Sequence, residues 1–449
     1  MTAEPPVREV PPPAESGRLR RHGVTIGFLL PAAILLGAWV VYPTVYTVIR
    51  SFFDATGNKF VGIDNYKSLF DPALGVRRAI VNNIYWVAVV PALITSIGLV
   101  FAVLTERVRW AVAFKTAVFM PMAISLFAAG VIWRIMDQQE PSRGAINGVI
   151  AAAHDAFSPP GVLADASPSV PGLTGSASKG LVLQKPLGSG GEALLGLTGI
   201  PPEGMPAGAK QAVAPKPASG EIVGVVWRDF KPGGGKPGKV EQGEFGIPGV
   251  KVALRDPKGG TFATTTSAND GSFHFDGVQG TGYKASISSS TFRKPFGGVA
   301  WLGSTTVAPG LKLVTVAVMI AYIWVWAGFA MVVIGAGLAA IPRDVLEASR
   351  TDGATEWQVF RRVTVPLLAP VLSVVFITML INVLKVFDIV LSVAPGSTQP
   401  DASVIALAMW RVSFGGVNDY GLGSAIAVFL FVLVIPILML NVRRFKRET

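Results

Sequence analysis

The residue types that most often carry catalysis are scarce and scattered in this chain of 449 residues. It has three histidines, His22, His154 and His274, which lie in different segments, and it has no cysteine. A histidine-based metal site needs ligands at short, regular spacings, and thiolate chemistry needs a cysteine. The sequence therefore predicts no catalytic residue, no metal ligand and no cofactor held by the chain itself.

One short motif imitates a nucleotide site. Gly233, Gly238 and Lys239 match the start of a phosphate-binding loop, but Val240 stands where such a loop needs a Ser or Thr hydroxyl for magnesium. The motif also lies among expected strands, with no helix after it. We predict that the chain is not an enzyme and that any ATP and magnesium are bound by partner subunits.

A different kind of chemistry, the docking of a partner, is indicated by the charged segment 341–366 between two long apolar stretches. Pro342 suits the first turn of a helix, and Gly353 suits the left-handed end of one. A second short helix would carry Trp357 and Phe360, three residues apart on one face. The pattern predicts a helix–glycine–helix knuckle with an exposed aromatic face. A simple amphipathic connector is the alternative.

Polar side chains also gather at the end of a long apolar run. Asn382 and Lys385 would share one helical face, as would Lys385 and Asp388. Polar groups are expensive in lipid and usually face a cavity, so these three are candidates for a solute path, with Phe387 and Trp324 as stacking partners. An interfacial ion pair or snorkelling of Lys385 is the equal alternative. Weaker candidates are Asn82, Asn83, Tyr85 and Trp86.

The elements that must position these residues are apolar helices. The chain is 51% hydrophobic and only 15% charged, whereas soluble domains average about 25% charged residues. Six stretches of 18 residues or more contain no Asp, Glu, Lys or Arg: Gly23–Ile49, Ala79–Thr105, Thr116–Trp133, Leu313–Pro342, Val363–Leu384 and Tyr420–Val442. Each is long enough to span a bilayer. We expect an all-α polytopic membrane protein with six transmembrane helices, rather than a large soluble protein with buried core helices.

The distribution of basic residues predicts the orientation. The expected cytoplasmic segments 1–22, 106–115, 343–362 and 443–449 carry 4, 3, 4 and 4 Lys or Arg, whereas the short outer loops 50–78 and 385–419 carry 5 and 2. Short cytoplasmic loops are enriched in Lys and Arg. We therefore expect a multi-pass protein of the cell membrane with both termini cytoplasmic and residues 137–308 extracytoplasmic. The net charge of +11 reflects this orientation, and no nucleic-acid partner is expected.

The region between the third and fourth stretches differs in composition. Residues 158–219 contain 10 Pro and 11 Gly among 62 positions and no Phe, Trp or Tyr, which predicts a linker. The expected domain order is a disordered cytoplasmic tail (1–22), three transmembrane helices (23–136), an extracytoplasmic flank and linker (137–219), a β-sandwich (220–293) and three further transmembrane helices (294–449).

The β-sandwich is predicted from alternating apolar and polar residues. The expected strands are Ile222–Trp227, Val250–Leu254, Ser272–Phe275 and Tyr283–Ser288, and Asn269-Asp270-Gly271 forms a turn. Val250, Val252 and Leu254 would face one core. About 70 residues of short strands suggest a small antiparallel sandwich.

This stretch resembles the B-type repeat domains of Gram-positive surface proteins, which are prealbumin-like sandwiches. The matching segments are Gly224–Asp229, Glu244–Val250, Asn269–Phe275 and Gly282-Tyr283. Members of that family often bind calcium through an acidic loop after the Trp. Here the loop 230–237 has lysines where carboxylates would be needed, so we predict no calcium site there.

The knuckle resembles the EAA signature of the permease subunits of ATP-binding-cassette (ABC) importers. That signature has Glu-Ala-Ala, three residues, Gly, nine residues and a hydrophobic pair ending in Pro. This chain has Glu347-Ala348-Ser349, Gly353 and Val363-Thr364-Val365-Pro366. The segments 60–66, 119–121, 131–133, 385–389 and 420–425 are similar to the carbohydrate branch, which includes the maltose, alpha-glucoside and glycerol-phosphate permeases.

This resemblance implies alternating access. An extracytoplasmic solute-binding lipoprotein would deliver a sugar to two permease subunits, the second one a paralogue, in the lipid bilayer. A dimer of cytosolic ABC ATPases would drive the movement. The implied ATPase-coupling residues are Glu347, Ala348, Ser349, Asp352, Gly353, Ala354, Trp357 and Pro366.

Other functions stay open at this point. The substrate could be a non-sugar solute such as glycerol-phosphate, another phosphodiester or a polyamine. The chain could also be a membrane-anchored surface protein whose β-sandwich does the binding, although six spans are excessive for an anchor. A self-sufficient channel or ion-driven carrier is the third alternative.

Overall fold

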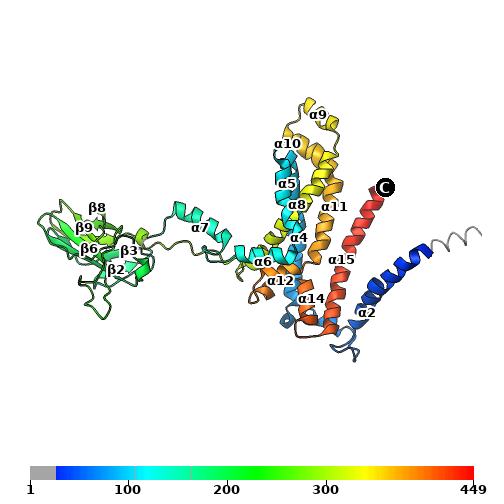
Figure 1. Cartoon of the computed structure of the whole chain (residues 1–449), viewed down its shortest axis with the longest axis horizontal. Helices are drawn as coiled ribbons and strands as arrows, with labels where there is room; N and C mark the ends of the chain where they lie inside the picture. Colours follow the sequence, from blue (N-terminus) through cyan, green and yellow to red (C-terminus); the bar gives the residue numbers. More distant parts are fainter. Residues whose placement is uncertain (1–26, 107, 162, 449) are drawn as a thin grey trace, which may run out of the picture. The chain divides into compact units, whose positions relative to one another are not determined.

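The computed structural model describes residues 27–106, 108–161 and 163–448. These residues form two compact units, which we describe separately. The helical unit holds the described residues up to Arg134 and those from Trp301 on, and the β unit holds residues 135–300. Figure 1 shows both units. The expected disordered tail, residues 1–22, lies outside the described residues.

The helical unit is built from long helices and several short ones. Its elements are η1 (Gly37–Val41), α2 (Tyr42–Arg50), α3 (Asp64–Ser68), η2 (Pro72–Leu74), α4 (Val76–Glu106), α5 (Ala111–Phe119), η3 (Met120–Ala123), α6 (Leu126–Met136), β11 (Thr306–Ala308), β12 (Leu311–Lys312), α8 (Leu313–Ala339), α9 (Arg343–Thr351), α10 (Glu356–Val359), η6 (Phe360–Thr364), α11 (Val365–Leu384), α12 (Asp388–Val393), α13 (Gln399–Ala402), α14 (Ile405–Phe414) and α15 (Tyr420–Glu448).

Four helices in the described part of the chain are long and apolar enough to cross a membrane: Gly27–Arg50, Val76–Glu106, Leu313–Ala339 and Glu356–Leu384. They coincide with the first, second, fourth and fifth predicted spans. Helix α4 packs against α8 and α11 (Figure 1), and α8 has the largest buried share of the four. The span Gly27–Arg50 buries none of its side chains in the described structure.

The third predicted span, Thr116–Trp133, is wrong as a single helix. The chain bends there by 103° between Ala111–Ala123 and Leu126–Met136, which makes the pair a broken span or a re-entrant loop. The described residues therefore hold four candidate spans, or five if this pair is one, against the six expected. Helix α15 runs through the whole of the sixth predicted stretch, and the apolar segment in its described part is Tyr420–Pro436.

The bend has a local cause. Pro121 lies in the tight 3₁₀ turn η3, and Ile124 after it is extended, with φ −97° and ψ 154°. The Ser125 hydroxyl oxygen then accepts a hydrogen bond from the Ala128 amide at 3.2 Å. Because Pro tolerates a first turn but interrupts a helix, and Ser caps a new one, the apolar run divides here.

The β unit begins with helix α7 (Ala145–Phe157) and continues as two packed sheets. Its strands are β1 (Ser167–Pro168), β2 (Leu173–Ser176), β3 (Gly180–Leu183), β4 (Leu187–Gly188), β5 (Gly191–Thr198), β6 (Ile222–Arg228), β7 (Lys251–Arg255), β8 (Thr261–Thr266), β9 (Ser272–Phe275) and β10 (Thr281–Ile287), with 3₁₀ turns η4 (Pro202–Gly204) and η5 (Ser289–Phe292). One sheet has the order β1-β5-β6-β9, and the other has the order β2-β3-β10-β7-β8, with β4 also paired to β10.

The four predicted strands are present, within two residues at each end, as β6, β7, β9 and β10. Val250, Val252 and Leu254 are buried in the core between the sheets, as expected. The expectation of a purely antiparallel sandwich is wrong, because β5 runs parallel to β6 over seven residue pairs.

The predicted linker 158–219 is also wrong. Strands β1 to β5 lie within it and complete both sheets. The segment has no large aromatic side chains, but it buries leucines beside Ile222 and Phe273: Leu173, Leu181, Leu183, Leu187, Leu195 and Leu197. Its glycines serve packing as well, since a Cβ at Gly196 would lie 2.9 Å from the Trp227 ring. The high Gly and Pro content of residues 158–219 suggested a flexible linker, whereas these residues are closely packed.

The role of this segment is testable by Leu195→Ala. Leu195 is fully buried on β5, and removing a buried leucine costs about 2–5 kcal/mol. We expect the temperature at which half of the β unit becomes susceptible to protease to fall by about 5–15 °C. The exposed Val213→Ala is the control. If this temperature were unchanged in Leu195→Ala, the linker interpretation would be restored.

Candidate functional site

The knuckle between α8 and α11 is built on a helix end that requires glycine. Helix α9 begins after Pro342 and runs from Arg343 to Thr351. At its end the Gly353 amide donates to the Arg350 carbonyl at 3.0 Å, and the Ala354 amide donates to the Ser349 carbonyl at 3.2 Å. This pair of bonds is a Schellman motif. Gly353 has φ +84°, the left-handed conformation that the motif needs, as the sequence predicted.

The second helix of the knuckle carries its own cap. The Thr355 hydroxyl oxygen accepts a hydrogen bond from the Gln358 amide at 3.4 Å, and the Gln358 side chain accepts one from the Thr355 amide at 2.8 Å. Such a capping box fixes where α10 begins. This capping box was not predicted from the sequence, although Thr and Gln three residues apart are a recognisable signal.

The exposed side chains of the knuckle form the surface on which a partner could dock. Trp357 is 66% exposed, and its ring centroid lies 5.5 Å from that of Phe360, with the rings inclined by 31°. Phe360 is half-buried and lies just beyond α10, whereas the sequence predicted both residues on the short helix. The two rings nevertheless lie side by side. The other predicted coupling residues are exposed at Glu347, Ala348, Asp352, Gly353 and Pro366 and half-buried at Ser349 and Ala354.

An ion pair joins the two helices of the knuckle. Arg350 Nε lies 2.9 Å from Glu356 Oε1, and both side chains are about half exposed. The pair lines a hollow of about 70 Å³ together with Val103 of α4 and Leu338 of α8. This contact was not predicted from the sequence, because the two residues are six apart across a turn and share no helical periodicity.

The knuckle leads into its span through an irregular turn. Residues Phe360–Thr364 form a π-helix, η6, which runs directly into α11 with Pro366 in the first turn. Arg361 and Arg362 are exposed on this turn. Single π turns inside helices are rare and often occur at functional sites, and no pattern in the sequence indicated this one.

The predicted solute-path residues are only partly brought together. Helix α11 ends at Leu384, Lys385 caps it, and Asp388 begins the separate helix α12. The prediction that Lys385 and Asp388 share a helical face is therefore wrong, and within the described residues they form no ion pair with each other. Asn382 is half-buried in α11.

The two aromatic candidates have partners on other elements. The Phe387 ring centroid lies 5.7 Å from that of Trp410 on α14, and the Trp324 centroid lies 5.9 Å from that of Trp133 on α6. Trp324 is 37% exposed. Flat aromatic faces of this kind can pack against the apolar faces of sugar rings. Within the described structure, no ring contact links the Phe387–Trp410 pair to the Trp324–Trp133 pair.

Asn82 and Asn83, weaker path candidates, serve the fold. Both are buried in α4. The Asn82 amide donates to the carbonyls of Asp401 and Ser403, each at 2.8 Å, and the Asn83 side-chain oxygen accepts from the Ile405 amide at 2.8 Å. These bonds hold the extended break between α13 and α14, whose backbone groups no helix satisfies.

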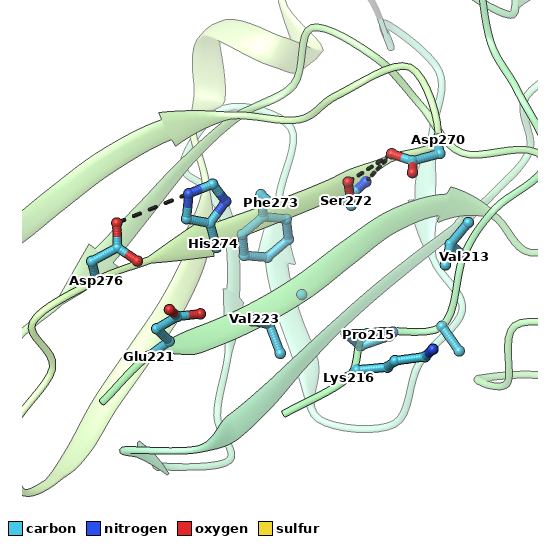
Figure 2. Close-up of a pocket in the computed structure, with 12 residues that line it drawn as sticks. Val213, Pro215, Lys216, Glu221, Val223, Asp270, Ser272, Phe273, His274 and Asp276 are labelled. Atoms are coloured by element: carbon cyan, nitrogen blue, oxygen red, sulfur yellow. Dashed lines mark hydrogen bonds and ion pairs between the residues drawn. The ribbon is translucent and has the colours of Figure 1, made fainter. Parts of the chain in front are cut away.

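The β unit has a separate groove of about 570 Å³ between the segment 213–216 and strands β6 and β9. Figure 2 shows His274 and Asp276 in one part of it and Asp270 with Ser272 in another. Hydrogen bonds from Ser272 hold the pKa of Asp270 below its ordinary value. Among the described residues that line the groove, Phe273 carries the phenyl ring, and this ring is buried. The groove therefore offers no exposed phenyl face on which a sugar could stack.

In the loop after Trp227, the Lys231 side chain lies near a carboxylate of the same chain. Lys231 Nζ lies 3.9 Å from Glu241 Oε1. Glu244 is buried, which together with neighbouring Asp229 and Glu241 raises its pKa above the ordinary value. No three His, Asp or Glu side chains in the described residues are grouped to hold a metal.

Comparison with known proteins identifies both units. Residues 299–447 match the binding-protein-dependent transport system inner membrane component, and residues 220–295 match the SdrD B-like domain. An ABC transporter permease of Caldicellulosiruptor sp. (strain Rt8B.4) is 33% identical over 126 residues, which cover 28% of this chain and 90% of the relative. The chain belongs to the ABC-transporter permease family. The permease is therefore a multi-pass membrane transport subunit and not an enzyme.

Two relatives match almost the whole permease. The osmoprotective compounds uptake permease of Synechocystis sp. (strain ATCC 27184 / PCC 6803 / Kazusa) is 28% identical over 94% of this chain and 98% of its own length. The alpha-glucoside transport system permease of Rhizobium meliloti (strain 1021) is also 28% identical, over 94% of this chain and 82% of its own length.

A solved structure shares the fold. The bacterial alginate ABC transporter, determined in complex with an alginate pentasaccharide-bound periplasmic protein, aligns over 97% of this chain and 98% of its own with a TM-score of 0.55 and 14% identity. At this identity the comparison shows the fold of the permease and no more.

The left-handed turn is testable by graded substitution of Gly353. Nothing lies within 4 Å of a Cβ placed there, so an added Cβ brings backbone strain of about 1–2 kcal/mol without itself clashing. We expect Gly353→Val to raise tryptic cleavage after Arg350 by about 5–30-fold, and Gly353→Asn to raise it less. Gly396→Val, also in open space, is the control. Equal cleavage in all variants would show that the turn does not hold the knuckle.

The role of Asn82 is testable by hydrogen exchange. Asn82→Ala leaves the carbonyls of Asp401 and Ser403 without this donor, which costs about 1–3 kcal/mol. We expect faster amide exchange over residues 401–408 and no change with the exposed Asn58→Ala. Unchanged exchange in Asn82→Ala would mean that other contacts hold this segment.

Proposed function

We propose that this permease forms half of the translocation path of an ABC importer for a sugar, an alpha-glucoside or an oligosaccharide. The knuckle 341–366 carries the proposal, because it presents the exposed Trp357 ring, packed beside Phe360, on a turn between two membrane-spanning helices. The sugar assignment is supported by the alpha-glucoside permease that resembles nearly the whole chain and by the aromatic pairs around Trp324 and Phe387.

In the proposed mechanism the knuckle docks in a groove of a cytosolic ATPase. Trp357 supplies the buried anchor, since large aromatic side chains dominate interface energies. Glu347 and Asp352 make polar contacts, and the backbone at Gly353 approaches the partner closely because it has no side chain. The ATPase dimer binds ATP and magnesium, and its closure moves the knuckle and α11 together.

The proposed topology has six transmembrane helices, with the bent pair α5–α6 as the third and α15 as the sixth. Both termini and the knuckle are cytoplasmic, and residues 137–308, with the β-sandwich, are extracytoplasmic. Support comes from the bias of Lys and Arg toward the segments on the knuckle's side of the membrane. The exposed Arg361 and Arg362 at the start of α11 agree with it.

On the outer side, we propose that a solute-binding lipoprotein releases the sugar into a path shared with a second permease subunit. The alginate transporter, with its periplasmic protein bound, supports this arrangement. Asn382, Lys385 and Asp388 would contact sugar hydroxyls, and Phe387 and Trp324 would stack on the ring. The unburied span Gly27–Arg50 leaves apolar surface for the second subunit or for lipid.

The docking role is testable by affinity purification from native membranes in mild detergent. Trp357→Ala removes the most exposed ring of the knuckle, and loss of an interface anchor of about 2 kcal/mol or more weakens binding at least tenfold. We expect an ATPase subunit to co-purify with the unmodified chain and to be largely lost with Trp357→Ala. Trp110→Ala, which removes a similarly exposed ring, is the control. Equal recovery with both variants would contradict docking at the knuckle.

The substrate class is tested by uptake in cells with and without the chain. We expect accumulation of radiolabelled maltose, trehalose or a longer alpha-glucoside that requires the chain and ATP. Uptake of glycerol-phosphate or a polyamine instead would assign the alternative substrate class. Uptake that survives ATP depletion with the ion gradient intact would contradict an ABC importer.

A further inference from the structure

A short turn joins the two helices of the knuckle, and among the described contacts the ion pair of Arg350 with Glu356 also connects them. The Schellman motif fixes the end of α9, and the capping box fixes the start of α10. Between them, the chain passes from Asp352 to Thr355 through Gly353. A Cβ placed at Gly353 would have no atom of a non-adjacent residue within 4 Å. The turn sets the direction of α10, but no packed side chain restrains the backbone around Gly353.

A contact that spans this turn is the ion pair of Arg350 with Glu356. The guanidinium reaches the carboxylate with Nε at 2.9 Å and Nη2 at 3.5 Å, a two-point contact that resists rotation better than a single bond. Both charges also lie where their helix favours them, Arg350 in the last turn of α9 and Glu356 in the first turn of α10.

The surroundings of this pair leave room for motion. The pair lines the hollow of about 70 Å³ against Val103 of α4 and Leu338 of α8, so the knuckle is incompletely packed on the spans beneath it. Because both side chains are about half exposed, the pair contributes little to global stability.

We propose that the Arg350–Glu356 pair is a brace that makes α9 and α10 move as one lever above this hollow. Arg350 is thus a positioning residue that acts through Trp357 and not a docking contact itself. The functional meaning of the brace rests on the proposed coupling role, since a lever is needed only where an ATPase pushes on it. Without the brace, movement at α10 would be absorbed at the turn around Gly353 before it reached α8.

The test uses the native absence of cysteine, which allows spin labels at two introduced cysteines, Val345→Cys on α9 and Arg361→Cys after α10, in the full chain in detergent. We expect Arg350→Gln to widen the distance distribution between the labels by about twofold or more, and Arg350→Lys to keep most of the unmodified width. Arg343→Gln, the same change in the first turn of α9, is the control.

Salt separates an electrostatic brace from ordinary packing. At about 1 M KCl the screening length falls to about 3 Å, so we expect the distribution to widen in the unmodified chain and to stay unchanged in Arg350→Gln. A narrow distribution in Arg350→Gln, or no response to salt in the unmodified chain, would overturn the proposal. ATPase co-purification is measured on the same samples. Its absence from the unmodified chain would refute the proposed function, and the label distances would still decide on the brace.

Discussion

The chain between α8 and α11 changes direction between α9 and α10 only if residue 353 adopts a left-handed backbone conformation. Gly353 does so at φ +84°, which lets the Gly353 and Ala354 amides satisfy carbonyls at the end of α9. A β-carbon at this position would meet no neighbour but would strain the backbone. The direction of α10, and with it the exposure of Trp357, follows from this one residue.

A second constraint acts inside the helical unit, where every break in a helix must find partners for its backbone groups. At the bend after Ile124, the Ser125 hydroxyl supplies one. At the break between α13 and α14, Asn82 and Asn83 of α4 supply three. Since unpaired backbone groups are intolerable in lipid, these polar side chains allow short helices to lie beside long ones. They also explain why buried amides in a span need not contact a solute.

The sequence predicted those features whose signals are local and strong. Long apolar runs predicted four of the spans, and Gly353 predicted the end of α9. The alternation at Val250, Val252 and Leu254 predicted a buried face that runs from the residue before β7 into β7. It failed where tertiary contacts decide. Pro121 divided an apolar run, leucines such as Leu195 built strands in a segment rich in Gly and Pro, and Arg350 found Glu356 across a turn. The solute path could not be located, because α11 ends before Lys385 and no periodicity crosses that end.

The most direct test of the account is a photocrosslink from the knuckle in living cells. A benzoylphenylalanine replaces Trp357 in one variant and the exposed Phe262 of β8 in another. The account predicts that position 357 forms a covalent adduct with a cytosolic ATP-binding subunit and that position 262 does not. No adduct at position 357, or an adduct there with a protein outside the cell, would contradict it.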